Sequence, residues 1–508
     1  MDESKPTAGE AARTEASACP VDHTALTGAA GAAGAAETDG GGTSPAQEPA
    51  VAHRRAAMPA TALPGPKLPA PLQVLKYWRH PAEFVERCQE EYGGRFALSI
   101  RIPPKPLYVL SDPDDIKQMF LAPPDVLHTG TGSSTIEKFT GQSGLAWLDE
   151  DEHKVRRKLL MPSFHGKALQ RIDTAIPEMA VTEVAKWPRG RDMPLHPHIH
   201  RFTLHVIREV IFGSKVPRQW DELIEVLIKM MGFNDRMGSA MMIHKMSARA
   251  VKVLRAVKPL GFDEFLNLRE RADALIAEAV DERRASGELG DDMLAVMLGI
   301  THEDGSPLSH RELRDEMMTI FLAGTETTAA AIAWSFEFLS REPEALKKLV
   351  EEIDLGEGDE YLTATVQEVL RLKPSIPQII PRTVMKPIEI GGVRFEPGML
   401  LWASAYLMNR DPSLYPEPKA FRPERFVGTK PGVYTWIPFG GGRIRCLGDK
   451  IALLEMKAVL REVLSRCELY RHDPTPEGTR SRSVSALPQR GAMLELRPRV
   501  REAAPGAV

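Results

Sequence analysis

One ten-residue segment of this 508-residue chain has the composition of a metal-binding loop. Residues 439–448 read Phe-Gly-Gly-Gly-Arg-Ile-Arg-Cys-Leu-Gly, and Cys446 is their only strong metal ligand. A helical pattern starts at residue 449, so the sulfur would lie at a helix N-terminus near Arg443 and Arg445. We expect this setting to lower the pKa of the Cys446 thiol, and a thiolate is a good ligand for a soft metal.

The number of ligands in this loop indicates which metal group it would hold. Structural zinc takes four protein ligands, and no other cysteine or histidine stands near Cys446 in the sequence. A haem iron needs one strong bond from the protein, because the porphyrin supplies four ligands. Glycines would let the backbone approach the flat porphyrin closely. The loop therefore predicts a haem; the alternative is a glycine-rich turn with an incidental cysteine.

A second unusual segment lies in a predicted helix over residues 312–339. Ser309 and Glu312 form the capping-box pattern that marks a helix start. Residues 323–328 read Ala-Gly-Thr-Glu-Thr-Thr, and glycine and threonine are poor helix formers. Threonine hydroxyls can bond to carbonyls one turn earlier and open the helix, and an acid beside an alcohol can relay protons. The alternative is a solvated Glu326 among threonines that are satisfied by the backbone.

The cysteine loop resembles that of the cytochrome P450 family, whose pattern is Phe-Gly-x-Gly-x-Arg/His-x-Cys-x-Gly. This resemblance implies that Cys446 binds the iron of haem b and that Phe439 shields it. The sequence departs from the pattern at Ile444, where the family has an arginine or histidine that contacts a haem propionate. Arg443 or Arg445 would then make this contact instead.

The unusual helix segment resembles a second motif of this family, Ala/Gly-Gly-x-Asp/Glu-Thr-Thr/Ser. By this resemblance, Thr327 supplies a hydroxyl on the side where dioxygen binds, and Glu326 is the acid of a proton relay. The likeness to the family extends over residues 63–496, with the motifs in the family's order.

Three basic residues match family positions that hold the haem propionates. His153 and Arg157 are one helical turn apart, as in the family's Trp/His-x-x-x-Arg, and would share one face of a helix. Arg382 follows Pro381 at the position of a further propionate arginine. The alternative for the first pair is a basic surface helix, since Lys154, Arg156 and Lys158 lie in the same segment. Both readings can hold together, with one face of the helix toward the haem and another toward a redox partner.

A third set of charged residues resembles the family's structural ion network. Glu368 and Arg371 form Glu-x-x-Arg at helical spacing, which alone is typical of a surface salt bridge. The resemblance joins both to Arg425 in a network that fixes the segment before the cysteine loop.

The resemblance implies a haem-thiolate monooxygenase. Such an enzyme inserts one atom of dioxygen into a lipophilic substrate, such as a fatty acid, terpenoid, steroid or macrolide. The sequence shows no flavin or iron–sulfur signature, so a ferredoxin or flavodoxin with its NAD(P)H-dependent reductase would supply electrons. Two alternatives remain open: a peroxygenase or isomerase that uses the same haem site, and a haem-binding sensor or carrier without turnover.

Hydrophobic periodicity predicts the elements that must position these residues. We expect helices over residues 80–92, 152–160, 203–212, 260–285, 312–339 and 449–465. Short strands are expected over residues 96–100 and 107–110. The chain is therefore predicted to be mainly α with small β-sheets, and the resemblance implies the cytochrome P450 fold, a single large triangular domain.

Composition sets the limits of the folded part and excludes some classes of function. Residues 1–62 are rich in Ala and Gly and predict a disordered tail, residues 63–498 the haem domain, and residues 499–508 a second tail. The net charge of −4 does not indicate nucleic-acid binding, and no apolar run is long enough for a membrane span. Only four cysteines and no signal peptide predict a cytoplasmic protein.

Two further clusters are interpreted as having no assigned catalytic role. His196, His198 and His200 surround Pro197, which favours a loop without a functional site. A methionine-rich stretch over residues 230–246 is either core filler or the pliable roof of a substrate pocket.

Overall fold

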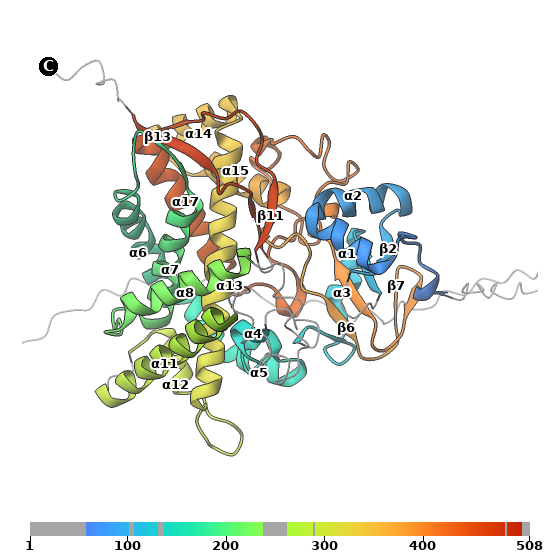
Figure 1. Cartoon of the computed structure of the whole chain (residues 1–508), viewed down its shortest axis with the longest axis horizontal. Coiled ribbons are helices and arrows are strands. Elements are labelled where there is room, and N and C mark those ends of the chain that lie inside the picture. The colour runs from blue at the N-terminus through green and yellow to red at the C-terminus, as the bar shows by residue number, and fades with distance from the viewer. Residues whose placement is uncertain are drawn as a thin grey trace, which may run out of the picture. The chain divides into compact units, whose positions relative to one another are not determined.

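The helix α13 (His310–Leu339) lies at the centre of the helical part of the structure. The computed structural model describes residues 57–100, 106–130, 137–236, 262–287, 290–482 and 485–499. Ser309 and Glu312 form the expected capping box at the start of α13. The helix is apolar and buried on most of its faces, as is typical of a helix at the centre of a core. Figure 1 shows α13 passing through the helical part of the protein.

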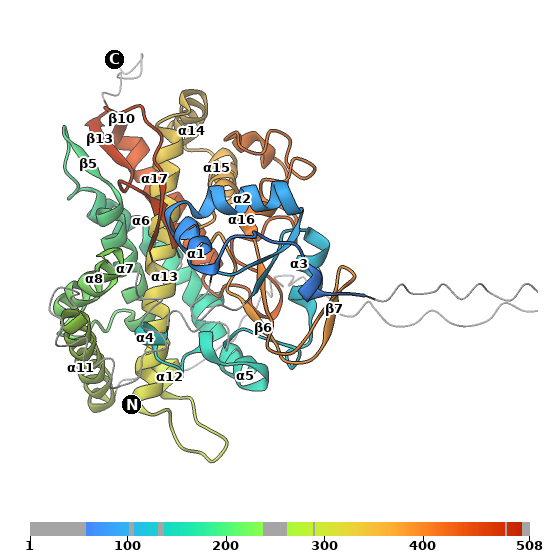
Figure 2. The same cartoon turned by 45° about the vertical axis from the view of Figure 1, so that its right-hand side comes forward.

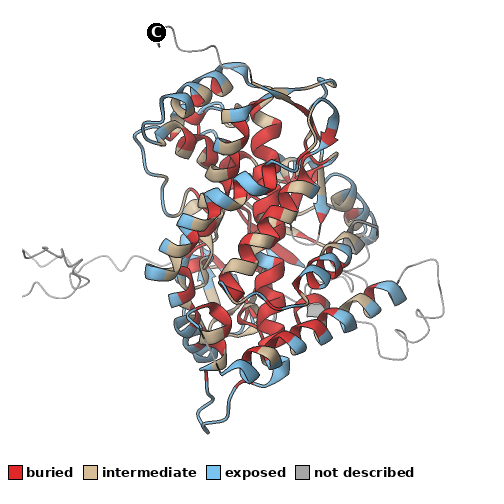
Figure 3. Cartoon of the chain, turned by 90° about the vertical axis from the view of Figure 1, so that its left-hand side faces the viewer, coloured by how far each residue is buried: buried red, intermediate tan, exposed pale blue. Residues whose placement is uncertain are grey.

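The other long helices pack around α13, which contacts α7, α11, α15 and α17 directly. Figure 3 shows buried positions gathered along the inner faces of these helices, with exposed positions outside. The helices of this part, long and short, are α4 (Glu137–Thr140), α5 (Glu150–Leu160), α6 (Gly166–Val184), α7 (His196–Phe212), α8 (Trp220–Arg236), α11 (Phe262–Ser286), α12 (Met293–Leu298), α14 (Pro343–Leu355), α15 (Glu360–Leu372) and α17 (Asp449–Arg466).

A five-stranded sheet lies beside the helical part, as Figures 1 and 2 show. Its strand order is β2-β3-β9-β6-β4, and β3 pairs in parallel with β9. The strands are β2 (Arg95–Leu98), β3 (Leu107–Leu110), β9 (Leu400–Ala403), β6 (Arg382–Val384) and β4 (Leu127–His128). The nearby helices are α1 (Ala70–Arg79), α2 (Pro81–Tyr92), α3 (Pro113–Leu121) and α16 (Ala405–Met408).

Three smaller sheets complete the fold, with orders β1-β8-β7, β10-β13-β5 and β11-β12. The hairpin of β11 and β12 matters for the site, because β12 packs on α13 and β11 on α8. The strands are β1 (Met58–Pro59), β5 (Asp192–Pro194), β7 (Ile388–Ile390), β8 (Val393–Phe395), β10 (Cys467–Tyr470), β11 (Thr479–Arg482), β12 (Ser485–Pro488) and β13 (Met493–Pro498).

The predicted class, mainly α with small sheets, is confirmed, and the expected helices and strands are present. The folded part begins before residue 63, because Met58 and Pro59 form β1 beside β8, and Ala60 is buried. The expected tails over residues 1–56 and 500–508 lie outside the described residues, as does most of the methionine-rich stretch. No helix in the described part of the chain has the length and apolar character needed to cross a membrane.

One local prediction is wrong. His196 and His200 do not lie in a loop but in the first turns of α7. The loop was inferred from Pro197, which occupies the first turn of the helix. A proline is tolerated there because the N–H groups of the first turn have no partner within the helix.

Candidate haem-thiolate site

The loop over residues 439–448 holds Cys446 directly before α17. The backbone N–H of Cys446 donates to the carbonyl of Phe439 at 3.0 Å, which closes the loop on itself. Gly442 has a φ of +65°, and a Cβ there would lie 2.4 Å from the carbonyl oxygen of Phe120. A larger residue at position 442 would therefore push the loop away from α3.

The electrostatic setting of Cys446 differs from the sequence prediction. Burial raises the pKa of the thiol, and the backbone N–H of Gly448 and the charges of Arg445 and Arg157 lower it less. The predicted lowering is therefore wrong for the protein alone, because loss of hydration outweighs the nearby charges. The residue Cys446 is nevertheless exposed, and coordination by a metal deprotonates a thiol outright.

Four basic residues from three parts of the chain lie around this loop. His153 and Arg157 come from α5, Arg382 from β6 and Arg443 from the loop itself. Burial, together with the charges of Arg157 and Arg443, lowers the pKa of His153 to about 4. Burial and the charge of Arg443 lower the pKa of Arg382 to about 9. The structure therefore concentrates positive charge that an anionic group would stabilise.

Arg443 and Arg445, the two candidates for the missing propionate contact, differ in their surroundings. The side chain of Arg445 binds Asp449 on α17 at 2.8 Å. The side chain of Arg443 donates to the carbonyl of Leu127 at 2.7 Å, and its charge acts on both His153 and Arg382. Arg443 therefore lies with the other basic residues, and Arg445 is committed to an ion pair.

The guanidinium of Arg382 offers the clearest sign that these residues accommodate a haem. It is fully buried, and its Nη1 donates to the carbonyl of Met119, but its Nε and Nη2 have no hydrogen-bond partner. Buried donors without partners are costly, and a propionate would satisfy them. Together with the accessible thiol of Cys446, this donor set fits a haem.

On α13, accessible surface is confined to a short stretch of an otherwise buried segment. Ala323 is exposed and Thr327, one turn later, is half-buried, while most of their neighbours are buried. The Thr327 hydroxyl donates to the carbonyl of Ala323 at 2.7 Å, and Ser375 donates to the carbonyl of Thr327 at 2.6 Å. The Thr327 hydroxyl therefore bonds within the helix, and the face of α13 that carries Ala323 and Thr327 is the face accessible to a ligand.

Glu326 does not share this accessible face. Its side chain is 2% exposed and lies among His196 and His200 of α7 and Arg482 of β11. Burial alone would raise the pKa of Glu326, but the histidines and Arg482 hold it well below its ordinary value. Sequence reasoning missed these three partners. The spacing of the histidines, one helical turn, was the available signal, and Arg482 had none.

The predicted ion network around Glu368 is present. Glu368 accepts from Arg371 at 2.7 and 2.8 Å, from Arg425 at 3.3 Å and from the backbone N–H of Arg422 at 2.8 Å. Arg371 also donates to three backbone carbonyls, which belong to Asn409, Pro418 and Ala420. This network ties α15 to the segment that leads to the cysteine loop.

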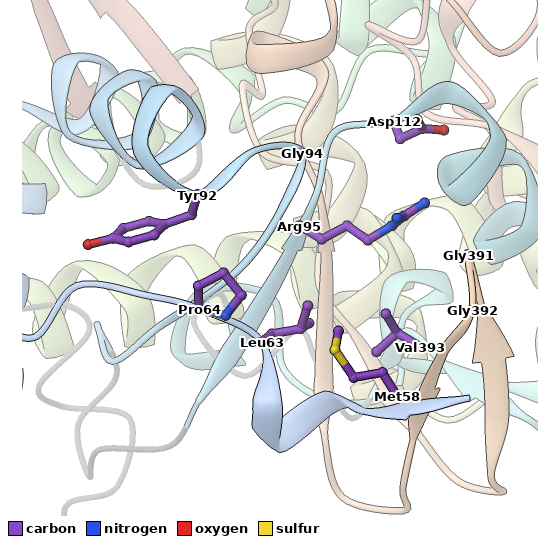
Figure 4. Close-up of a pocket in the computed structure, with 10 residues that line it drawn as sticks. All are labelled: Met58, Leu63, Pro64, Tyr92, Gly94, Arg95, Asp112, Gly391, Gly392 and Val393. Atoms are coloured by element: carbon purple, nitrogen blue, oxygen red, sulfur yellow. The ribbon is translucent and has the colours of Figure 1, made fainter. Parts of the chain in front are cut away.

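A separate surface pocket of about 350 Å³ lies apart from these residues (Figure 4). It is lined by β1, β8 and the segment between α2 and β2, and it includes Tyr92 and Arg95. Arg95 is paired with the carboxylate of Asp115. None of the cysteine-loop or α13 residues lines it, so it is not part of the haem-thiolate site.

Comparisons with known proteins agree with this site. The model of the Cytochrome P450 family matches residues 63–496. Cytochrome P450 135B1 of Mycobacterium tuberculosis, a provisional name, is 34% identical over 444 residues, which cover 85% of this chain and 91% of the relative. Cytochrome P450 138 of the same species, also named provisionally, is 33% identical over 441 residues, which cover 86% and 96%.

Solved structures give the same result for the fold. The haem domain of cytochrome P450DA aligns with a TM-score of 0.73 at 23% identity, covering 88% of this chain and 98% of that structure. The cyanobacterial CYP120A1 with bound retinoic acid aligns with a TM-score of 0.69 at 22% identity, covering 82% and 94%. These matches confirm the single-domain fold. The chain therefore belongs to the cytochrome P450 family of haem-dependent monooxygenases.

Proposed function

We propose that this chain inserts one atom of dioxygen into a lipophilic small molecule, with electrons from a ferredoxin or flavodoxin and its NAD(P)H-dependent reductase. The proposal is supported most by two features that occur together: Cys446 is exposed in its loop, and two buried donors of Arg382 have no hydrogen-bond partner. One is the ligand that a haem iron needs, and the other is the partner that its propionate needs.

In this proposal, Cys446 supplies the ligand to the iron, and the basic residues orient the porphyrin. Arg382, Arg443, His153 and Arg157 would bind its propionates. Haem bound in this way supplies the oxygen-activating redox chemistry, and a thiolate ligand favours cleavage of the O–O bond. Phe439, whose carbonyl accepts from the backbone N–H of Cys446, would shield the sulfur.

The accessible face of α13 would provide the oxygen-side chemistry. The Thr327 hydroxyl can hold a proton donor or water at that face, because its oxygen keeps acceptor capacity while its proton bonds to Ala323. Glu326, the residue before Thr327, would supply the carboxylate of the proton relay. The apolar residues Ala323, Ile376 and Ile380 keep accessible surface, and an apolar substrate would exclude water from them.

The exposed side of α5 is the proposed docking surface for the electron donor. Lys154 and Lys158 point outward on this helix, while Arg157 on the same helix donates to the carbonyl of Arg445 at 2.6 Å. Positive charge on this face, next to the cysteine loop, would steer an acidic donor protein. We also propose a cytoplasmic location, which fits Cys88 and Cys467, both free thiols in the described part of the chain.

Replacing Thr327 by Ala tests the monooxygenase proposal against the peroxygenase and isomerase alternatives. A lipophile panel of fatty acids, terpenoids, steroids and macrolides is first screened for a shift of the Soret band, and the strongest binder serves as substrate. We expect Thr327→Ala to lower NAD(P)H-supported product formation about 10- to 100-fold and to leave peroxide-supported turnover intact. The control is Thr325→Ala, which removes a buried hydroxyl that donates to the carbonyl of Phe321.

Two results would contradict the proposal. Equal NAD(P)H-supported rates in the Thr327 and Thr325 variants would favour chemistry that needs no proton relay. A redox donor that reduces the iron without any product or oxygen consumption would favour a carrier or sensor.

A further inference from the structure

A buried polar cluster joins α13 to α7 and β11. It consists of Glu326, His196, His200 and Arg482, and each of these residues is at most 7% exposed. The Nε2 atoms of His196 and His200 lie 3.1 and 3.4 Å from the two carboxylate oxygens of Glu326. Arg482 approaches the same carboxylate at 3.3 Å and also donates to the carbonyl of Met231 on α8.

The contacts to the histidines have ion-pair distances but no well-directed hydrogen bonds. Both Nε2 atoms and one carboxylate oxygen of Glu326 have no hydrogen-bond partner in the structure. Leaving buried polar atoms without a hydrogen-bond partner is unfavourable, so packing alone does not explain this arrangement. Among the described residues, no three His, Cys, Asp or Glu side chains have the geometry to hold a metal ion, so these ring nitrogens are not explained as metal ligands.

Glu326 is ionised in this cluster, because the charged groups around it hold its pKa well below the ordinary value. The guanidinium of Arg482 balances the Glu326 carboxylate, so a second positive charge on an imidazole is not required for neutrality. Burial lowers the pKa of His200 to about 4, so this imidazole is neutral at ordinary pH. A neutral imidazole has one N–H and one free lone pair, and it can accept a proton at one nitrogen while it donates from the other.

We propose that His196 and His200 are positioning residues that pass protons to Glu326, so that protons reach the oxygen-activating face of α13 from α7. This inference rests on the proposed monooxygenase function. In each transfer, a proton from water binds Nδ1 of a neutral imidazole that carries its hydrogen on Nε2, the Nε2–H bond breaks, and an O–H bond forms on Glu326. The ring is then in its Nδ1–H form and regains the Nε2–H form by tautomer exchange before the next transfer. Glu326 then releases its proton towards Thr327 and returns to the carboxylate, and no electron moves.

The charged groups around the histidines are few and come from three elements. Glu326 faces both from α13 and Arg482 faces them from β11, while Arg201 acts on His200 from α7 itself. On α6, Glu183 acts instead on His198. His198 lies between the two cluster histidines in sequence, but its ring lies near that of Trp187 in a tilted arrangement, so it provides a matched control on the same helix.

The first test needs no substrate. The carbon monoxide complex of the reduced holoenzyme is diamagnetic, so ¹⁵N-histidine spectra can report which ring nitrogen carries hydrogen. We expect His200 to be neutral at pH 7, both rings to carry hydrogen on Nε2, and Glu326→Gln to shift both signals. Signals with hydrogen on Nδ1 only, or signals that do not respond to Glu326→Gln, would overturn the proposal.

The second test compares the double variant His196→Gln/His200→Gln with His198→Gln. Glutamine keeps a polar amide near Glu326 but cannot pass a proton. With the strongest binder of the lipophile panel, we expect NAD(P)H-supported product formation to fall at least about 10-fold in the double variant only. Peroxide-supported turnover should be spared, since hydrogen peroxide brings both protons.

The outcomes separate this inference from the proposed function. If the double variant matches His198→Gln in rate, pH profile and rate ratio between H₂O and D₂O, the histidines do not relay protons and the monooxygenase proposal still holds. If the unmodified enzyme shows no NAD(P)H-supported turnover, both proposals fail.

Discussion

The buried network around Glu368 allows a quantitative prediction. Glu368 and Arg371 are both fully buried, and Glu368 accepts four hydrogen bonds, three of them from arginine side chains. Glu368→Gln keeps the size of the side chain but removes its charge and turns one acceptor into a donor that faces Arg371. The Arg371 guanidinium then stays buried without a counter-ion.

Breaking a buried ion pair by removing one partner typically costs about 3–5 kcal/mol, because the remaining charge is uncompensated. We therefore expect Glu368→Gln to lower the free energy of unfolding by roughly this amount. Urea unfolding followed by loss of the Soret band should show a midpoint lower by about 1 M or more.

The control is Glu424→Gln, which lies in the same segment. Glu424 pairs with Lys348 on the surface, where both side chains are about half exposed, so the shift should be much smaller. Equal midpoints for Glu368→Gln and Glu424→Gln would refute the reasoning, because burial would then make no difference to the pair.

Three further predictions address the cofactor, the electron donor and pH. Arg382→Leu should release haem at least about 10-fold faster to an apo-globin acceptor, since it removes the unsatisfied propionate donors; unchanged haem loss would contradict this role. Lys154→Glu with Lys158→Glu should raise the apparent KM for ferredoxin, most strongly at low salt, without changing reduction by dithionite. Burial lowers the pKa of His200 from 6.5 to about 4, so as the pH falls this imidazole is protonated in the unfolded chain before it is protonated in the folded protein. The free energy of unfolding should therefore fall by about 3 kcal/mol between pH 6.5 and pH 4. Urea unfolding over this range should show a smaller loss in His200→Gln, and an equal loss would show that His200 does not titrate in this way.

The sequence predicts the fold class and the order of the elements because local patterns determine them. The capping box at Ser309 and Glu312 and the apolar periodicity that follows define α13 without any tertiary information. The start of α7 could not be predicted equally well. Pro197 has opposite meanings in a loop and in the first turn of a helix, and only the packing of His196 and His200 on α13 separates them.

For the candidate site, the sequence identifies residues by motif but not by surroundings. It predicts the network of Glu368, Arg371 and Arg425, which the structure confirms. It does not predict that Arg443 rather than Arg445 joins the basic cluster, because this depends on the ion pair of Arg445 with Asp449. The lowered pKa predicted for Cys446 is wrong for a related reason: sequence proximity to arginines says nothing of burial.

Glu326 shows the same limit most clearly. Its neighbours in sequence indicate an acid beside an alcohol, whereas its neighbours in space are two histidines and an arginine. Arg482 is 156 residues away in sequence and has no motif of its own. The charge state of this carboxylate is therefore a property of the folded protein alone.

The most direct test of the account is the spectrum of the reduced protein with carbon monoxide. We predict the strongly red-shifted Soret absorption that an anionic sulfur opposite the gas produces, and its loss in Cys446→Ser but not in Cys467→Ser. A spectrum like that of an imidazole-ligated globin, or a red shift that survives Cys446→Ser, would contradict the claim that Cys446 binds the iron.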